Sequence, residues 1–359
     1  MIDDKKLLNE INNIQKNFYR VKSYTDYLVL YEKISHLSIL YRQLTGIELD
    51  IIIPNINNYY LKIDERKFNS DESLEQYYFN QKEHNKLSGK VLGTFNRSGI
   101  NFSILDRDTS KISLAKQIEL INAFLYDLNP KMQVLFNNML KNNLIDNSPV
   151  GLPEGLGGVT FFDYETKEYI LLKNSNRIKF VDYLMHELGH AYSYKMLENK
   201  SRKQQFSFGD TFFEMPSTFM ELCFQDFLKR NHVYEEDRLK LQIDYFYKMH
   251  FFFRNLKNCK YVTLLDSDNI RRMHYSYIYS YGYYLSMLIH EDKLKDKEST
   301  LERLDDYLSY QGLLDRDEQL KIFGLDRDKL KDMKVLKKRL ESHNNDVDAY
   351  LIRNRNWPL

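Results

Sequence analysis

Glycine and proline are scarce in this chain, and their placement constrains its fold more than any other feature. The 359 residues hold thirteen glycines and six prolines, and four of those glycines and two of those prolines lie within residues 147–158. Both residue types mark turns, so a chain this poor in them favours long helices over a turn-dense β fold. Residues 147–158 are therefore predicted to form a loop between mostly helical regions.

The apolar pattern on both sides of that loop predicts the secondary structure. Apolar side chains recur at three- and four-residue spacings in four parts of the chain: residues 3–45, 70–90, 113–143 (with a break at Pro130) and from Lys179 onwards. Residues 159–162 and 169–172 have the composition of two short strands, joined at 163–167. We therefore predict a mainly α fold with a small β-sheet directly before the helix that begins near Lys179.

Charge and hydropathy exclude several classes of protein. The 52 basic and 51 acidic side chains leave a net charge of +1, so electrostatics gives no reason to expect nucleic acid or an anionic membrane as a partner. A hydrophobic content of 43% argues against disorder. Residues 1–6 lack the pattern of a signal peptide, and no stretch of the chain is apolar enough to span a membrane. We expect a soluble cytoplasmic protein.

Two histidines with a glutamate between them form a candidate metal site. His186 and His190 are four residues apart, so on a helix they lie about 40° from each other and can bind one ion. Glu187 projects about 100° from His186, where it can hold a zinc-bound water rather than the zinc. The alternative is an accidental HExxH on a packed helix. The apolar helix face and the strand pair upstream favour the zinc site.

A third ligand is expected from the acidic residues downstream. Glu214 and Glu221 are seven residues apart and would share one face of a continuous helix, about 20° from each other. Pro216 belongs in a first turn, so a helix that begins near residue 215 weakens that inference. One carboxylate as a ligand and a second that orients a histidine would suit zinc. The alternative is a solvated pair of glutamates.

These residues carry a family resemblance. The segment His186-Glu187-Leu188-Gly189-His190-Ala191, followed by Glu214-Met215-Pro216-Ser217-Thr218-Phe219-Met220-Glu221, resembles the HE(F/L)GHA and E-x-P-S-x-x-x-E motifs of the thimet oligopeptidase and oligoendopeptidase F family. This family consists of gluzincin zinc metallopeptidases with a strand pair before the zinc helix, which residues 157–172 resemble. The resemblance implies that His186, His190 and Glu214 bind one zinc ion per chain. It makes Glu187 the general base and places Glu221 behind a ligand.

The family also carries a histidine and several tyrosines on a later helix that faces the scissile bond. The candidates here are His274, Tyr277 and Tyr281, which lie within about 60° of one another on a helix. Two alternatives stay open at this point. Arg271 would take the histidine position if the gap in the match lies elsewhere, and any single tyrosine could belong to a Tyr-rich core helix.

The resemblance covers residues 157–290, and family members are commonly much longer, so this chain is expected to be a compact form. We divide it into an N-terminal helical region (1–150), a catalytic core (151–290) and a C-terminal helical region (291–359), packed as one catalytic unit. The expected activity is zinc-dependent hydrolysis of internal bonds in oligopeptides, with the substrate extended along the edge of the 158–172 strand pair. The alternatives are a gluzincin carboxypeptidase or aminopeptidase, and a protein-specific or toxin-like metalloprotease.

Overall fold

The chain is mainly helical, as the sequence predicts. The computed structural model describes residues 4–18, 24–47, 49, 81–105, 108–146, 158–162, 168–172, 176–198, 212–258, 267–311 and 313–355. The elements are α1 (Asp4–Phe18), α2 (Tyr24–Thr45), α6 (Gln81–Ser98), α7 (Leu114–Leu128), α8 (Pro130–Lys141), β1 (Ile145–Asp146), β2 (Gly158–Phe162), β3 (Glu168–Leu172), α9 (Ile178–Leu197), α11 (Met215–Arg230), α12 (Glu235–Asn258), α13 (Ser267–Lys293), α14 (Lys297–Tyr310), α15 (Arg316–Ile322), the 3₁₀ turn η1 (Lys329–Lys331) and α16 (Lys334–Arg355).

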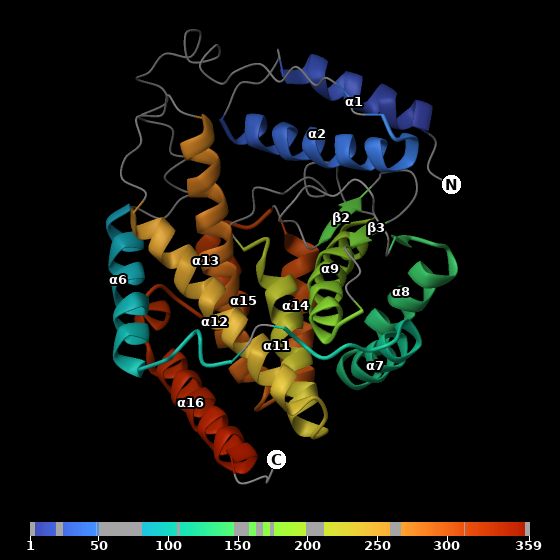
Figure 1. Cartoon of the computed structure of the whole chain (residues 1–359). Helices are drawn as coiled ribbons and strands as arrows, with labels where there is room; N and C mark the ends of the chain where they lie inside the picture. Colours follow the sequence, from blue (N-terminus) through green and yellow to red (C-terminus); the bar gives the residue numbers. More distant parts are fainter. Residues whose placement is uncertain are drawn as a thin grey trace.

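The N-terminal helices α1 and α2 form a pair that lies across one end of the molecule (Figure 1). Four apolar side chains of α1 at helical spacing are buried, Leu7, Ile11, Ile14 and Phe18. The helical structure predicted for residues 3–45 is thus present as α1 and α2. Helix α2 of this pair contacts β2.

Local sequence rules also account for the break between α7 and α8. Helix α7 ends at Leu128, and Pro130 is the first residue of α8, where its missing N–H costs nothing. The Asn129 side chain between the helices accepts a hydrogen bond from the backbone N–H of Lys131 and caps α8. The predicted break at Pro130 is confirmed.

The sheet has three strands in the order β1-β3-β2. Strands β2 and β3 are antiparallel, with Thr160 opposite Ile170, and they match the two predicted strands. Strand β1 pairs with β3 in parallel, and its two residues are too few for a recognisable alternation in the sequence. Strand β2 is therefore an edge strand among the described residues. Helix α9 packs against β2 and β3.

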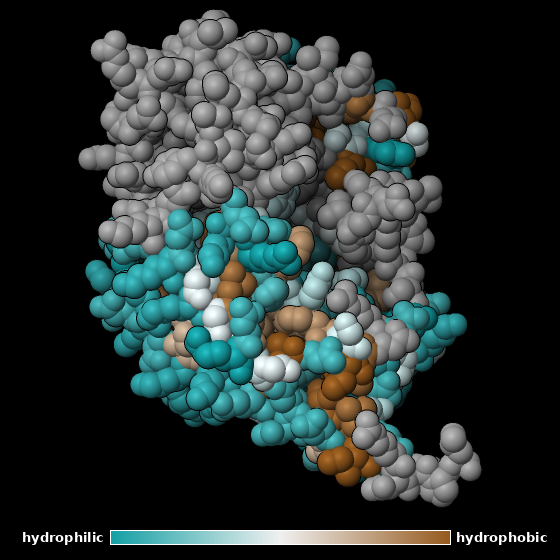
Figure 2. Space-filling model, turned by 60° about the vertical axis from the view of Figure 1, so that its left-hand side comes forward, coloured by the Kyte–Doolittle hydropathy of each residue, from teal (hydrophilic) through white to brown (hydrophobic). Residues whose placement is uncertain are grey.

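The hydrophobic core lies where α11 is held between α9 and α13. Helix α12 packs against α6, α11 and α13, and α16 lies along α6 and α12 (Figure 1). One continuous set of buried apolar side chains extends from Leu87 in α6 to Leu340 in α16. The described surface in Figure 2 is mostly hydrophilic, with apolar side chains in small patches. The three-part division into 1–150, 151–290 and 291–359 stays a prediction.

None of the described helices combines the length and the apolar composition needed to cross a membrane. The predicted loop at 147–158 lies outside the described residues except for Gly158. The turn at 163–167 and the first part of the helix predicted for 70–90 also lie outside them.

Candidate metal centre and active site

Three side chains from two helices converge on one buried point. Helix α9 carries His186 and His190, and Glu214 lies directly before the first residue of α11. Glu214 Oε2 is 3.2 Å from His186 Nε2 and 3.5 Å from His190 Nε2. The donor atoms of the three residues all lie within 4.8 Å of one another. The structure thus brings together the three residues that the sequence predicts as metal ligands.

The donor set fits a small divalent cation. Ligand bonds of about 2.0–2.1 Å in a tetrahedron place neighbouring donor atoms roughly 3.3 Å apart, close to the two observed separations. Glu214 Oε2 is buried, and despite the short distances it makes no hydrogen bond to any residue that the structure describes. A buried carboxylate oxygen without a hydrogen bond is costly unless a cation neutralises it. These three residues therefore form a site that can hold a metal ion.

Glu221 orients one of the histidines. His186 Nδ1 lies 2.6 Å from Glu221 Oε1, a charge-assisted hydrogen bond in which the ring N–H donates to the carboxylate. A proton held at Nδ1 leaves the Nε2 lone pair for a metal ion, which is the usual relation between a ligand histidine and the carboxylate behind it. Glu221 thus occupies the supporting position that the sequence predicts.

The charges of the site explain its titration. Burial lowers the pKa of His186, but the close carboxylates of Glu214 and Glu221 outweigh this and hold that pKa well above its ordinary value. Burial also disfavours the charged form of Glu214 and so raises its pKa. The nearby His190 and His186 outweigh this and hold that pKa well below its usual range. The carboxylates of Glu214 and Glu221 thus favour a positive charge at His186. A cation that binds there takes the place of a proton.

Two glycines let the three helices of the site approach closely. A Cβ added at Gly189 of α9 would lie 2.5 Å from Ser217 Cα in α11, and one added at Gly282 of α13 would lie 2.6 Å from Glu214 Cβ. Any larger residue at either position would displace backbone or the ligand itself. The element that approaches Gly189 is therefore helix α11. Pro216 lies in the first turn of α11, as the sequence predicts, and Glu221 follows within the same helix.

Glu187 lies beside the ligands and is held by the sheet. Its carboxylate oxygen Oε2 is 2.6 Å from the hydroxyl of Thr160 on β2. Both residues are almost fully buried, at 7% and 4% exposure. The sequence predicted the glutamate but not the threonine, because 27 residues and an undescribed turn separate the two positions.

Helix α13 presents two rows of tyrosines. Tyr281 donates or accepts a 3.0 Å hydrogen bond with His84 Nδ1 of α6, and the Tyr277 ring packs edge-on against the same histidine. The predicted pair Tyr277 and Tyr281 therefore contacts α6, and the Tyr281 ring also lies beside Phe212 and Phe253. His274 lies within α13, but its side chain is outside the described residues, so its role stays a prediction.

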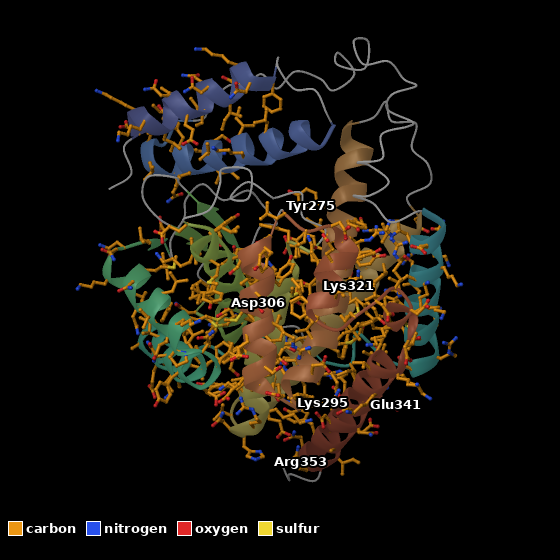
Figure 3. All side chains as sticks on the ribbon, turned by 180° about the vertical axis from the view of Figure 1, so that it is seen from behind. Tyr275, Lys295, Asp306, Lys321, Glu341 and Arg353 are labelled. Atoms are coloured by element: carbon orange, nitrogen blue, oxygen red, sulfur yellow. The ribbon has the colours of Figure 1, made fainter. Side chains whose placement is uncertain are left out.

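The second row runs along another face of α13. Tyr275, Tyr279 and Tyr283 stack in sequence, and Figure 3 shows Tyr275 near the end of the core that faces α1 and α2. Burial raises the pKa of Tyr279, and the charges of Glu214 and Glu187 add to the rise. Sequence reasoning did not single out Tyr279. The contact of Gly282 with Glu214 is what identifies this side of α13 as the one near the metal site.

A layer of buried charge lies behind Glu221. The Lys248 ammonium of α12 is 3.1 Å from Asp244, and although burial lowers its pKa, Glu221 and Asp244 raise it above the ordinary value. Asp182, one turn before His186 on α9, has its pKa raised by burial and then by the charge of Glu221. Lys248 of α12 thus adds a positive charge near Glu221.

Comparison with known proteins shows the fold. No family model and no curated protein matches this chain. Among solved structures, a protein from Bacillus anthracis strain Ames assigned as an oligoendopeptidase F is 14% identical, with a TM-score of 0.57 over 89% of this chain and 63% of that one. PZ peptidase A with an inhibitor is 12% identical, with a TM-score of 0.54 over 96% of this chain and 76% of that one.

A third structure, a protein from Chlamydophila abortus assigned as a peptidase, is 13% identical and has a TM-score of 0.50 over 94% of this chain and 64% of that one. The chain therefore has the fold of the oligoendopeptidase F structures. It spans less than two thirds of the length of the Bacillus anthracis protein. Identities this low extend the likeness to the fold and no further.

Proposed function

We propose that this protein is a zinc-dependent peptidase that hydrolyses internal bonds of oligopeptides. The observation that carries the proposal is the convergence of His186 Nε2, His190 Nε2 and Glu214 Oε2 at separations that suit a tetrahedral ion. The fold shared with the oligoendopeptidase F structures supports the reaction class. Two imidazoles and one carboxylate are a donor set typical of catalytic zinc sites.

Each residue around the proposed ion has a separate role in the reaction. Zinc in such a site polarises a carbonyl group and lowers the pKa of a water to about 7. His186, His190 and Glu214 hold the ion, and Glu221 keeps the His186 ring in the orientation that exposes Nε2. Glu187 accepts the proton of the attacking water and later returns it to the leaving amine.

The substrate is placed by the edge strand. Strand β2 has β3 on one side only among the described strands, so its other edge offers backbone N–H and C=O groups to an extended peptide. Thr160 at the middle of β2 contacts Glu187, so a peptide paired with this edge lies close to the general base. A zinc ion held there would stabilise the negative charge that develops on the peptide oxygen. A hydroxyl or imidazole of α13 assists it, for which His274, Tyr277 and Tyr281 are the predicted residues. Tyr279 is the tyrosine near Glu214 and Glu187.

The test combines metal content with cleavage mapping. Zinc-loaded protein is incubated with a library of unstructured peptides of different lengths, and mass spectrometry locates the cuts. We expect internal cuts, one zinc per chain, and no cuts by a Glu187→Gln variant that still binds zinc. Release of single terminal residues would instead indicate a carboxypeptidase or aminopeptidase. A Glu187→Gln variant that cleaves at the wild-type rate would overturn the assignment of the base, and zinc-loaded wild type that cuts no peptide would overturn the proposed activity.

A further inference from the structure

Thr160 makes an unusual pair of contacts for a threonine in a sheet. Its hydroxyl is 2.6 Å from Glu187 Oε2 and 3.1 Å from the Glu187 carbonyl oxygen. A hydroxyl has one proton to donate, and the charged carboxylate at the shorter distance forms the stronger bond. The carbonyl oxygen lies inside α9, where the helix already supplies it with a backbone donor. The proton of Thr160 is therefore assigned to the carboxylate.

The strand geometry fixes where that hydroxyl points. Thr160 pairs with Ile170 of β3 in the antiparallel register, and both side chains are buried. Side chains alternate between the two faces of a strand, and Thr160 lies on the face toward α9. The backbone of β2 is at the same time the open edge of the described sheet. One residue thus belongs both to the strand edge and to the surroundings of the base.

We propose that Thr160 is a positioning residue that fixes the carboxylate of Glu187 and aligns it with the edge of β2. This inference rests on the proposed function, and it adds a residue that the sequence motifs do not contain. The bond restrains Oε2, while Oε1 has no hydrogen-bond partner among the residues that the structure describes. Thr160 thereby leaves one oxygen of Glu187 to act on a proton and determines the direction from which it acts. Strand β2 then holds both the peptide that pairs with its edge and the carboxylate of Glu187.

Three variants separate this role from a general need for a buried hydroxyl. Thr160→Val keeps the shape and the strand preference of threonine but removes the hydroxyl, and Thr160→Ser restores it. Thr94→Val is the matched control, since Thr94 in α6 is 5% exposed against 4% for Thr160, and its hydroxyl donates to its own helix at Lys90 O. For each zinc-loaded protein, zinc affinity is measured by competition with a chromophoric chelator, and kcat and KM are measured on one library peptide.

We expect Thr160→Val to bind zinc as the wild type does and to keep its KM, with kcat lower by about 10- to 100-fold, the usual effect of losing an outer partner at a metal site. Thr160→Ser recovers most of kcat, and Thr94→Val changes none of the three quantities. A residue that only supported the fold would lower the unfolding temperature without this selective loss of kcat.

Crystal structures of zinc-loaded wild type and Thr160→Val test the same proposal without activity. In the variant the Glu187 carboxylate is expected to leave its single position. Unchanged kcat together with an unchanged Glu187 would overturn the role of Thr160 and leave the peptidase assignment intact. If the wild type cuts no peptide, the peptidase assignment fails, and the position of Glu187 in the two crystal structures alone decides the role of Thr160.

Discussion

Buried histidines occur in two contrasting regions of this protein. In the first region His186 lies between the carboxylates of Glu214 and Glu221, which raise its pKa despite burial. In the second, at the contact of α13 with α16, His290 Nδ1 is 2.6 Å from the Arg339 guanidinium, and burial and Arg339 together lower its pKa well below the ordinary value. His343 of α16 resembles His290, with Arg238 as its nearby cation.

The difference shows what distinguishes a metal site from a structural histidine. Burial is similar in the two regions, so burial alone does not identify a ligand. The sign of the surrounding charge does, because carboxylates attract a divalent cation and hold a histidine so that one ring nitrogen is available, whereas a guanidinium repels the cation and uses that nitrogen itself. His186 has the first environment and His290 has the second. His343 shares the nearby guanidinium, that of Arg238, but its Nδ1 lies 2.9 Å from Gln242 Oε1.

The strongest test of this contrast removes one carboxylate from each region. Glu214→Ala should abolish zinc binding and turnover, because two histidines remain as ligands and their neighbouring charge is lost. Glu291→Ala removes a carboxylate that pairs with Lys338 and Arg339 in the second region, and it should keep one zinc per chain. Metal analysis after dialysis checks both variants, and circular dichroism verifies that they fold. Equal zinc content in the two variants would contradict the contrast.

A second test compares the two tyrosine rows of α13. If Tyr279 stabilises negative charge on the reacting peptide, Tyr279→Phe should lower kcat by about 10²-fold, the typical effect of losing one such donor. Tyr281→Phe removes a hydrogen bond to His84 and should lower the free energy of unfolding by about 1 kcal/mol with little effect on kcat. Steady-state kinetics and urea unfolding on both variants check this. The opposite ranking of kcat would favour Tyr281, the residue predicted from the sequence.

A third test concerns the glycines that flank the first region. Gly189→Ala places a Cβ 2.5 Å from the Ser217 backbone, so we expect a loss of about 3 kcal/mol in the free energy of unfolding. Gly89→Ala in α6 is the matched control, because a Cβ there meets no atom within 4 Å and a helical alanine should stabilise by about 1 kcal/mol. Urea unfolding of the metal-free proteins measures both effects. The same sign of change in both variants would show that the close approach of α9 and α11 does not limit stability.

The last test concerns the acid sensitivity of the second region. Burial and then Arg238 lower the pKa of His343 from 6.5 to about 4, against the opposing charge of Asp346. Between these two pKa values His343 is protonated in the unfolded chain and neutral in the folded chain. Its contribution to the free energy of unfolding is therefore complete above pH 6.5 and is lost as the pH falls. The loss between pH 6.5 and 5 should be about 2 kcal/mol.

His343→Asn keeps a donor for Gln242 Oε1 without a titrating ring, so its stability should fall less steeply over the same range. Urea unfolding at a series of pH values compares the variant with the wild type. Parallel pH profiles of the two proteins would show that His343 does not titrate on unfolding.

Much of the fold and part of the site were predictable because they depend on local rules. The spacing of His186, Glu187 and His190 determines their arrangement on a helix, since every residue of a helix turns by the same angle. Pro130 and Pro216 mark helix starts because proline lacks a backbone donor, and the structure has α8 and α11 beginning there. The composition of residues 159–162 and 169–172 likewise indicated the two strands β2 and β3.

Other features could be decided only by the tertiary structure. The meeting of Glu214 with His186 and His190 depends on how α11 packs against α9, and that packing rests on Gly189 and Gly282, whose neighbours are distant in the chain. The same packing determines which tyrosines of α13 lie near Glu214, and helical periodicity alone allowed either row. Thr160 and Glu187 come into contact because a strand and a helix stack, and no local pattern encodes that contact. The sequence by itself thus determined which chemical groups α9 carries, and the long-range packing of α9, α11, α13 and β2 decided which other side chains reach them.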